Sequence, residues 1–399
     1  MNGMGVTYPL GFRAAAVEAA VKKPGRNDLA IIVSDCPCAA AAVFTRNLFA
    51  AAPVLYSRRI IEQDGSVRAI VVNSGNANAG TGETGLRDAE SMATLTGSGL
   101  GIGKDEVLVA STGVIGRPMP MDRIAAGIGK ACAVLARDGG GAGADAGLDV
   151  ARAIMTTDTV EKIASRTVSG REGEIRIGGI CKGAGMIHPD MATMLAFLTT
   201  DAALSSDVLH PMLRRAADKT FNAVSVDNDM STNDSAFLLA NGAAGDVDLE
   251  AFEATLTDLC RELALKIVAD GEGATKVVMI EVTGARTDAE AALAADAVAT
   301  SMLVKTALNG NDPNWGRILA AVGRSGAVID TGRIRIELAG FPLFEKGLPT
   351  EADLAEVSTR MKAKEVRIRV EIGLGTGSRT VYTTDLSREY VSINADYTT

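Results

Sequence analysis

The chain has 399 residues, of which 40 are Lys or Arg and 49 are Asp or Glu, so its formal net charge is −9. This acidic balance argues against a nucleic-acid-binding protein, whose domains normally carry a basic surface, and against docking on an anionic membrane. Hydrophobic residues make up 47% of the chain, which excludes a largely disordered protein, and the length predicts two or three domains or one large domain.

Short apolar runs rich in Val and Ile alternate with Ala-rich segments of helical spacing. These patterns predict, in chain order, a strand at 69–72, a helix at 84–96, a strand at 107–110, a helix at 121–137, a strand at 174–177, a helix at 249–269, a strand at 277–282, a helix at 287–308 and a strand at 365–372. A glycine cluster at 139–143 predicts a flexible connection. The pattern predicts a mixed α and β fold with polar loops at the strand ends.

Residues that usually bind metals are scarce. The chain has two histidines and five scattered cysteines, which argues against a metal site and predicts reduced thiols. We recognise no targeting segment at the start and no run of about 18 apolar residues, so we expect a cytoplasmic protein.

A polar segment at 227–234 begins like a calcium-binding loop. Thr232 occupies the sixth position, where such a loop needs Gly, and Leu238 occupies the twelfth, where it needs Glu. We therefore interpret the segment as a polar turn that satisfies its own backbone, unless another role is found.

One segment combines a predicted strand, a glycine-rich loop and a proline. It runs Lys-Gly-Ala-Gly-Met-Ile-His-Pro-Asp-Met-Ala-Thr-Met-Leu from Lys182 to Leu195. This pattern resembles the ornithine acetyltransferase family of arginine biosynthesis, also called glutamate N-acetyltransferase. Members of that family cleave themselves before the Thr, which becomes the nucleophile. The resemblance implies cleavage of the Ala192–Thr193 bond into an α chain, 1–192, and a β chain, 193–399.

Motifs along nearly the whole chain carry the same resemblance. They lie at 11–14, 42–45, 51–54, 73–78, 111–116, 155–159, 222–234, 271–276, 312–317 and 394–397. Small departures are Asn228, where Gly is expected, and the less usual 309–311 before the Asp-Pro-Asn-Trp motif. The resemblance implies an α+β fold, namely a layered αββα sandwich of the ornithine acetyltransferase or N-terminal-nucleophile aminopeptidase type. It also implies a heterotetramer that pairs two αβ units.

The chemistry of an N-terminal threonine agrees with this picture. A Thr hydroxyl is a weak nucleophile that needs an adjacent base, and a free α-amine with a pKa of about 7.7–8.0 supplies one. Before cleavage the nitrogen of Thr193 is an amide and cannot act as a base, so cleavage creates the catalyst. We expect the Thr193 hydroxyl to attack the Ala192 carbonyl and form an ester that water opens.

Cleavage and acetyl transfer both pass through a tetrahedral oxyanion, which hydrogen-bond donors stabilise. The resemblance assigns the oxyanion hole to Thr112 and Gly113. It implies substrate contacts at Thr156, Lys182, Thr193, Glu272, Asn394 and Thr399. Thr157 or Thr159 could replace Thr156. Asn394 and Thr399 predict a terminal tail that is tied down beside the nucleophile.

The leading hypothesis is ping-pong transfer of acetyl from N2-acetyl-L-ornithine to L-glutamate through an acetyl-Thr193 ester. No metal or organic cofactor is expected. Acetyl-CoA is a candidate co-substrate, and no residue in the sequence indicates whether it is used. The alternatives are an N-terminal-nucleophile aminopeptidase or amidase, with water as the acceptor, and a non-catalytic amino-acid-binding protein that never cleaves. The expected partners are small-molecule substrates and a second copy, with no nucleic acid and no membrane.

Overall fold

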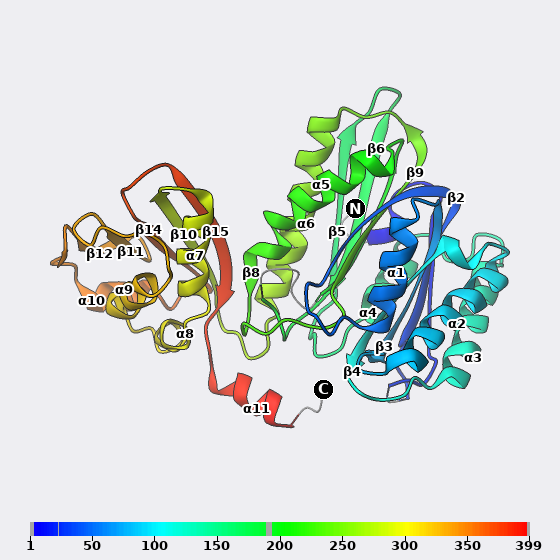
Figure 1. Cartoon of the computed structure of the whole chain (residues 1–399), viewed down its shortest axis with the longest axis horizontal. Coiled ribbons are helices and arrows are strands. Elements are labelled where there is room, and N and C mark those ends of the chain that lie inside the picture. Colours follow the sequence, from blue (N-terminus) through cyan, green and yellow to red (C-terminus); the bar gives the residue numbers. More distant parts are fainter. Residues whose placement is uncertain (1–3, 23, 189–193, 397–399) are drawn as a thin grey trace. The chain divides into compact units, whose positions relative to one another are not determined.

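The computed structural model describes residues 4–22, 24–188 and 194–396, which form two compact units (Figure 1). Unit 1 contains the residues up to Asn222 and Asp229–Ile267, and unit 2 contains Ala223–Asn228 and the residues from Val268 onward. The boundary between the units therefore differs from the predicted division between α and β chains, whose bond lies outside the described residues. That division stays a prediction.

In the described part of unit 1, the strands form an eight-stranded sheet. Their order is β4-β3-β2-β9-β7-β6-β5, and β1 pairs with β2. The bounds are β1 Phe12–Val17, β2 Leu29–Phe44, β3 Val67–Asn76, β4 Val107–Val114, β5 Lys162–Ser169, β6 Glu174–Lys182, β7 Leu195–Ala202 and β9 Ser235–Gly245. The first half of β2 pairs with β1 and β3, and its second half pairs with β9. One long strand thus belongs to two half-sheets, β1–β4 and β5–β9.

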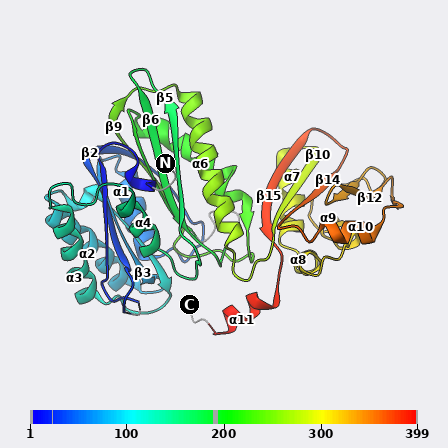
Figure 2. The same cartoon turned by 180° about the vertical axis from the view of Figure 1, so that it is seen from behind.

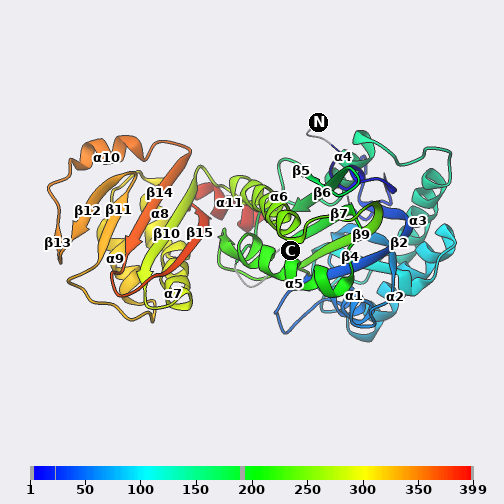
Figure 3. The same cartoon turned by 90° about the horizontal axis from the view of Figure 1, so that it is seen from above.

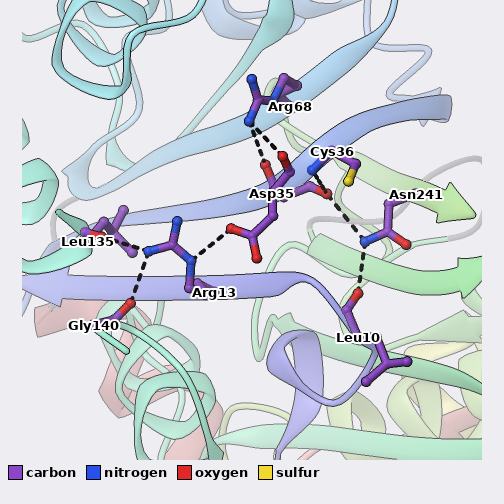
Figure 4. A network of polar contacts seen from close by, with 9 residues as sticks. Leu10, Arg13, Asp35, Cys36, Arg68, Leu135, Gly140 and Asn241 are labelled. Carbon is purple, nitrogen blue, oxygen red and sulfur yellow. Dashed lines mark hydrogen bonds and ion pairs between the residues drawn. The ribbon is translucent and has the colours of Figure 1, made fainter. Parts of the chain in front are cut away.

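Polar side chains hold β2 where it passes from one half-sheet to the other (Figure 4). Arg13 Nε donates to Asp35 Oδ1 at 2.9 Å, and its Nη1 donates to the carbonyl of Gly140 at 3.2 Å. Asn241 of β9 donates to the carbonyl of Leu10 at 2.8 Å. The glycine cluster that we predicted as a flexible connection is therefore hydrogen-bonded to β1 in the structure.

Helices cover the outer faces of both half-sheets (Figures 1 and 2). Helices α2 and α3 lie on the first half-sheet, α5 packs on β2, and α6 lies against β6, where Cys181 Sγ is 3.6 Å from the Leu263 carbonyl. One hydrophobic cluster contains Ile70 of the first half-sheet and Phe197 of the second. The layers confirm the predicted αββα sandwich. The helices are α1 Ala52–Glu62, α2 Gly82–Leu100, α3 Met121–Leu135, α4 Ala144–Ala153, α5 Ser206–Asp218 and α6 Leu249–Ala269.

Unit 2 has its own sheet and its own core. Its described strands form a seven-stranded sheet in the order β13-β12-β11-β14-β10-β15-β8, with α7 beside β10 and β15 (Figure 3). The strands are β8 Val224–Ser225, β10 Val277–Ala285, β11 Arg335–Leu338, β12 Phe341–Glu345, β13 Leu348–Pro349, β14 Glu365–Glu371 and β15 Gly377–Thr384. The helices are α7 Asp288–Ala299, α8 Met302–Asn309, α9 Trp315–Gly323, α10 Leu354–Arg360 and α11 Arg388–Asp396.

Two predictions about element boundaries were wrong. The helix predicted at 287–308 is two helices, because the Ser301 side chain accepts the N–H of Val304 and starts α8 anew. Strands β3 and β4 run on to Asn76 and Val114, where we predicted polar loops, because their parallel pairing continues. Within the described residues no single helix is long and apolar enough to cross a membrane. Helices α7 and α8 have sufficient length and apolar composition only when taken together, and the pair is bent by 55°.

Candidate active site

The segment that contains the predicted nucleophile connects β6 to β7. These strands are antiparallel neighbours, and Lys182 at the end of β6 lies opposite Leu195 at the start of β7. The cleavage bond Ala192–Thr193 and the nucleophile itself lie outside the described residues. Because Lys182 and Leu195 pair with each other, the residues on either side of the loop lie at the same end of these two strands.

A buried carboxylate, Asp158, organises the start of this loop. Its Oδ1 accepts hydrogen bonds from Lys162 Nζ at 2.7 Å and from the Gly183 N–H at 2.6 Å. Its Oδ2 accepts the Thr156 N–H at 2.9 Å and lies 3.9 Å from Lys182 Nζ. The structure thus brings together two of the predicted substrate residues, Thr156 and Lys182. Sequence reasoning gave Asp158 no role, although it lies in one of the matching motifs.

The electrostatics of this cluster favour a charged Asp158. Burial would raise the pKa of Asp158, but the charges of Lys182 and Lys162 and the hydrogen bonds of the site outweigh it and hold that pKa below its usual range. Lys22 lies in the same neighbourhood and was missed by sequence reasoning. Burial and repulsion from Lys182 lower the pKa of Lys22 to about 8, against the attraction of Asp28 and other groups. Lys162 and Lys182 thus lie beside one carboxylate, and cationic groups of this kind form strong hydrogen bonds with an anionic ligand group.

The predicted oxyanion-hole residues lie near the end of β4, which pairs in parallel with β3. Gly113 lies opposite Gly75, and its φ is +134°. A Cβ at position 113 would stand 2.3 Å from the carbonyl carbon of Gly75, so only glycine permits this approach of the two backbones. Thr112 is buried, and the Ser111 hydroxyl donates to Asn73 Oδ1 at 2.6 Å. The backbone around Thr112 and Gly113 is therefore tightly held, as an oxyanion site requires.

The segment that precedes β9 joins β4 to the start of β7. Asn233 Nδ2 donates to the carbonyl of Ser111 at 2.9 Å and to that of Ala77 at 2.6 Å. The N–H of Met194 donates to Asp234 Oδ1 at 3.0 Å. The interpretation of 227–234 as a turn that satisfies only its own backbone was therefore incomplete. Its last two residues bind the strand of Thr112 and the residue that follows Thr193.

Unit 2 brings its own two predicted substrate residues together. Asn394 of α11 donates from Nδ2 to Glu272 Oε2 at 2.8 Å, although the two residues are far apart in the sequence. Ser387 donates to the carbonyl of Gly273 at 2.6 Å and ties the start of α11 to the same loop. The tail is thus attached as far as α11, while Thr399 lies outside the described residues and its contact stays a prediction.

Asp385 holds the following part of that loop. It accepts the backbone N–H of Thr275 at 2.8 Å and the Asn309 side-chain N–H at 2.6 Å. The departure from the family pattern at 309–311 therefore has a structural role in unit 2. In the part of the chain that the structure describes, no group of three or more His, Cys, Asp or Glu side chains is placed to hold a metal ion.

Comparison with known proteins gives consistent matches over the full length. A model of the ArgJ family matches residues 13–399. The arginine biosynthesis bifunctional protein ArgJ of Geobacter sulfurreducens is 50% identical and covers 98% of this chain and 99% of that relative. The protein of the same name from Thermus thermophilus is 49% identical and covers 99% of this chain and 100% of that relative.

Solved structures match over part of the chain. The crystal structure of the ArgJ protein of Bacillus halodurans is 38% identical, covers 50% of this chain and 98% of that chain, and has a TM-score of 0.49. The ornithine acetyltransferase of Mycobacterium tuberculosis, complexed with ornithine, is 39% identical, covers 47% of this chain and 95% of that chain, and has a TM-score of 0.42. From the family model and the full-length relatives, the chain belongs to the ArgJ family.

Proposed function

We propose that the chain is a self-cleaving acetyltransferase of arginine biosynthesis, which moves acetyl from N2-acetyl-L-ornithine to L-glutamate through an ester on Thr193. Its full-length relatives at 50% and 49% identity are named bifunctional arginine biosynthesis proteins, which supports the pathway. The reaction follows from the resemblance of the segment 182–195 and of the other motifs. Acetyl-CoA is proposed as a second acetyl donor.

The observation that carries the proposal is the convergence of three parts of the chain in unit 1. Lys182 pairs with the first residue of β7, and the N–H of Met194 is bound by Asp234. The neighbour of Asp234 is hydrogen-bonded to Ser111, which directly precedes Thr112. The parts that should supply the nucleophile, the oxyanion hole and a substrate cation thus meet around one segment.

The proposed reaction has two half-reactions. The free amine of Thr193 takes the hydroxyl proton while Oγ attacks the acetyl carbonyl, and the oxyanion is held by Thr112 and Gly113. The amide C–N bond then breaks, the ornithine nitrogen takes the proton, and acetyl stays on Oγ. The neutral amine of glutamate attacks this ester, the amine of Thr193 takes the proton that the attacking nitrogen loses, the bond between the acetyl carbon and Oγ breaks, and that proton passes to Oγ. Every proton and leaving group is accounted for without a metal or an organic cofactor.

Lys182 is proposed to bind a substrate carboxylate. It is buried beside Asp158 and Lys22, so its charge acts in a region with little water. In such surroundings a charge-assisted hydrogen bond contributes more than at an exposed surface. Lys182→Ala should therefore weaken substrate use more than folding, and an equal loss of soluble protein would indicate a structural lysine instead.

Cleavage would leave the two chains interleaved. In the sheet order, β7 and β9 belong to the proposed β chain, and their outer neighbours β6 and β2 belong to the α chain. Both boundaries are antiparallel ladders of six residue pairs. We therefore propose that the α and β chains stay together as one αβ unit, and that two such units pair in the cytoplasm.

The test combines electrophoresis under denaturing conditions with an acetyl-transfer assay. We expect two bands near half the full mass, a β chain that begins Thr-Met-Leu-Ala, and transfer from acetylornithine to glutamate, run beside acetyl-CoA plus glutamate. Thr193→Ala should remain one inactive chain, and Thr193→Ser should cleave and keep some activity. Hydrolysis without glutamate dependence would favour the aminopeptidase or amidase alternative. One intact band that binds amino acids would favour a binding protein.

A further inference from the structure

Two adjacent buried side chains, Asn233 and Asp234, connect the strands that carry the proposed reaction centre. Asn233 is 6% exposed and Asp234 is 1% exposed. Neither is among the residues that the family resemblance assigns to the oxyanion hole or the substrate. Each nevertheless makes a hydrogen bond to a backbone group directly next to an assigned residue.

Asn233 acts on the peptide group that contains the Thr112 N–H. The carbonyl of Ser111 and the N–H of Thr112 belong to one planar amide. Asn233 Nδ2 donates to that carbonyl at 2.9 Å, and a donor at the oxygen polarises the amide and strengthens its N–H as a donor. The second Nδ2 hydrogen goes to the Ala77 carbonyl at 2.6 Å, and Oδ1 accepts from the Thr232 hydroxyl at 2.7 Å. Three hydrogen-bond partners thus hold the side-chain amide of Asn233 in one orientation.

Asp234 acts on the peptide group that follows Thr193. The N–H of Met194 donates to Asp234 Oδ1 at 3.0 Å, and this N–H belongs by covalent structure to the same amide as the carbonyl of Thr193. The carbonyl of Met194 accepts the Ser235 N–H at 3.1 Å, which holds the other side of the residue. Burial raises the pKa of Asp234 well above its ordinary value. The hydrogen bond from the Met194 N–H, the charge of Lys182 and the hydrogen bond with Thr45 lower this pKa but do not outweigh burial.

We propose that Asn233 and Asp234 are positioning residues of the acetyl-transfer reaction. Asn233 orients and polarises the oxyanion-hole strand through Ser111, and Asp234 orients the nucleophile residue through the Met194 N–H. The inference rests on the proposed function, because it assigns the two residues to that same site. It explains why one short polar segment binds both β4 and the start of β7.

The chain offers matched controls for a purely structural role. Ser57 is fully buried and also binds the backbone of β4, because its hydroxyl donates to the Val109 carbonyl and accepts the Val109 N–H, both at 2.8 Å. Asp201 is fully buried and accepts the N–H groups of Arg176 at 2.7 Å and Leu10 at 3.0 Å. Ser57→Ala and Asp201→Asn should therefore cost stability without affecting the reaction centre.

For Asn233, the test is the split between kcat and KM. Removal of a direct oxyanion donor lowers kcat by about 10²–10³, so loss of a residue that acts through such a donor should lower kcat by about 10–100. We expect Asn233→Ala to show this loss with KM changed by less than about threefold, while Ser57→Ala keeps kcat within about threefold. Equal kcat losses in both variants would overturn the role of Asn233. Should Asn233→Ala not fold, Asn233→Ser keeps one donor and is held to the same criterion.

For Asp234, the test is rescue by the conservative variant. Asp234→Asn keeps an oxygen that can accept the Met194 N–H, so we expect self-cleavage and kcat within about threefold of the wild type. Asp234→Ala should slow both by about tenfold or more, whereas Asp201→Asn should slow neither. Equal behaviour of Asp234→Ala and Asp201→Asn overturns the inference. A wild type that cleaves but transfers no acetyl from acetylornithine to glutamate refutes the proposed function instead, and the cleavage rates still decide the role of Asp234.

Discussion

Replacement of Asp158 by Asn tests the electrostatic design of the site, because it removes the charge that balances buried lysines. The side chains of Asp158 and Lys162 are both 0% exposed, and their contact is 2.7 Å. Removal of one partner of a buried ion pair costs about 3–5 kcal/mol, because the other charge stays buried. The amide oxygen of Asn can still accept the N–H of Thr156 or Gly183. We therefore expect the free energy of unfolding to fall by about 3 kcal/mol, the lower end of this range.

The expected magnitude is readily measured. One kcal/mol shifts the unfolding midpoint of a domain of roughly 150–250 residues by about 2–4 °C, so Asp158→Asn should lower the midpoint of the transition that unfolds unit 1 by roughly 6–12 °C. Asp201→Asn, which removes no ion pair, should lower it less. Adding Lys162→Met to Asp158→Asn should recover most of the lost unfolding midpoint, because neither of the two positions then carries a buried charge.

The difference in unfolding midpoint between the wild type and Asp158→Asn should depend on pH in a defined direction. The folded-state pKa of Asp158 lies below its ordinary value of about 3.9, so its stabilising contribution is fully present above that pH and is lost as the pH falls through the folded pKa. Thermal scans should therefore show a constant gap between the wild type and Asp158→Asn from about pH 5 to pH 7, and a smaller gap below about pH 4. A midpoint change under about 2 °C at pH 7, or no recovery with Lys162→Met, would refute the reasoning.

Three further predictions concern the strands and the tail. Gly113→Ala should block self-cleavage, seen as a persistent full-length band, because its Cβ would stand 2.3 Å from Gly75, whereas Gly129→Ala meets nothing within 4 Å and should cleave normally. The cleaved chains should elute together in gel filtration and separate only in denaturant, since β7 and β9 lie inside the sheet; separation in plain buffer would contradict that order. Asn394→Ala should raise KM severalfold with little effect on cleavage, and an unchanged KM would remove Asn394 and its bond to Glu272 from substrate binding.

Local patterns predicted fewer than half of the helices and strands that the structure describes, and the errors at their ends have local causes. The helix at 249–269 and the strand at 365–371 agree closely with prediction, because each has a long, regular hydrophobic period. The break between α7 and α8 was missed, because the flanking apolar positions continue the helical period through the Ser301 cap. The ends of β3 and β4 were missed because polar residues and glycine usually mark turns, whereas here parallel pairing keeps them in the sheet.

Residues of the candidate site could be proposed from the sequence only where they belong to a motif that the family shares. The family resemblance assigns roles to Lys182, Thr112 and Gly113 that stay predictions, and the structure shows a steric reason for glycine at position 113. Asp158, Lys22 and the roles of the residues at 233–234 were not identified. Their significance depends on which distant backbone groups they approach, and a polar side chain in a turn-like segment carries no local sign of its partner.

By itself, the sequence determined the family and the alternation of helices and strands, and it predicts the segment that should cleave, because these depend on residue identity and on short-range periodicity. Only the tertiary structure decided that β7 and β9 insert between β2 and β6, that Asp158 sits among Lys162, Lys182 and Lys22, and that Asn233 and Asp234 bind neighbours of Thr112 and Thr193. Hydrogen bonds and buried charges act over a few ångströms, so they join residues that the chain separates by many positions and that only its folding brings into contact.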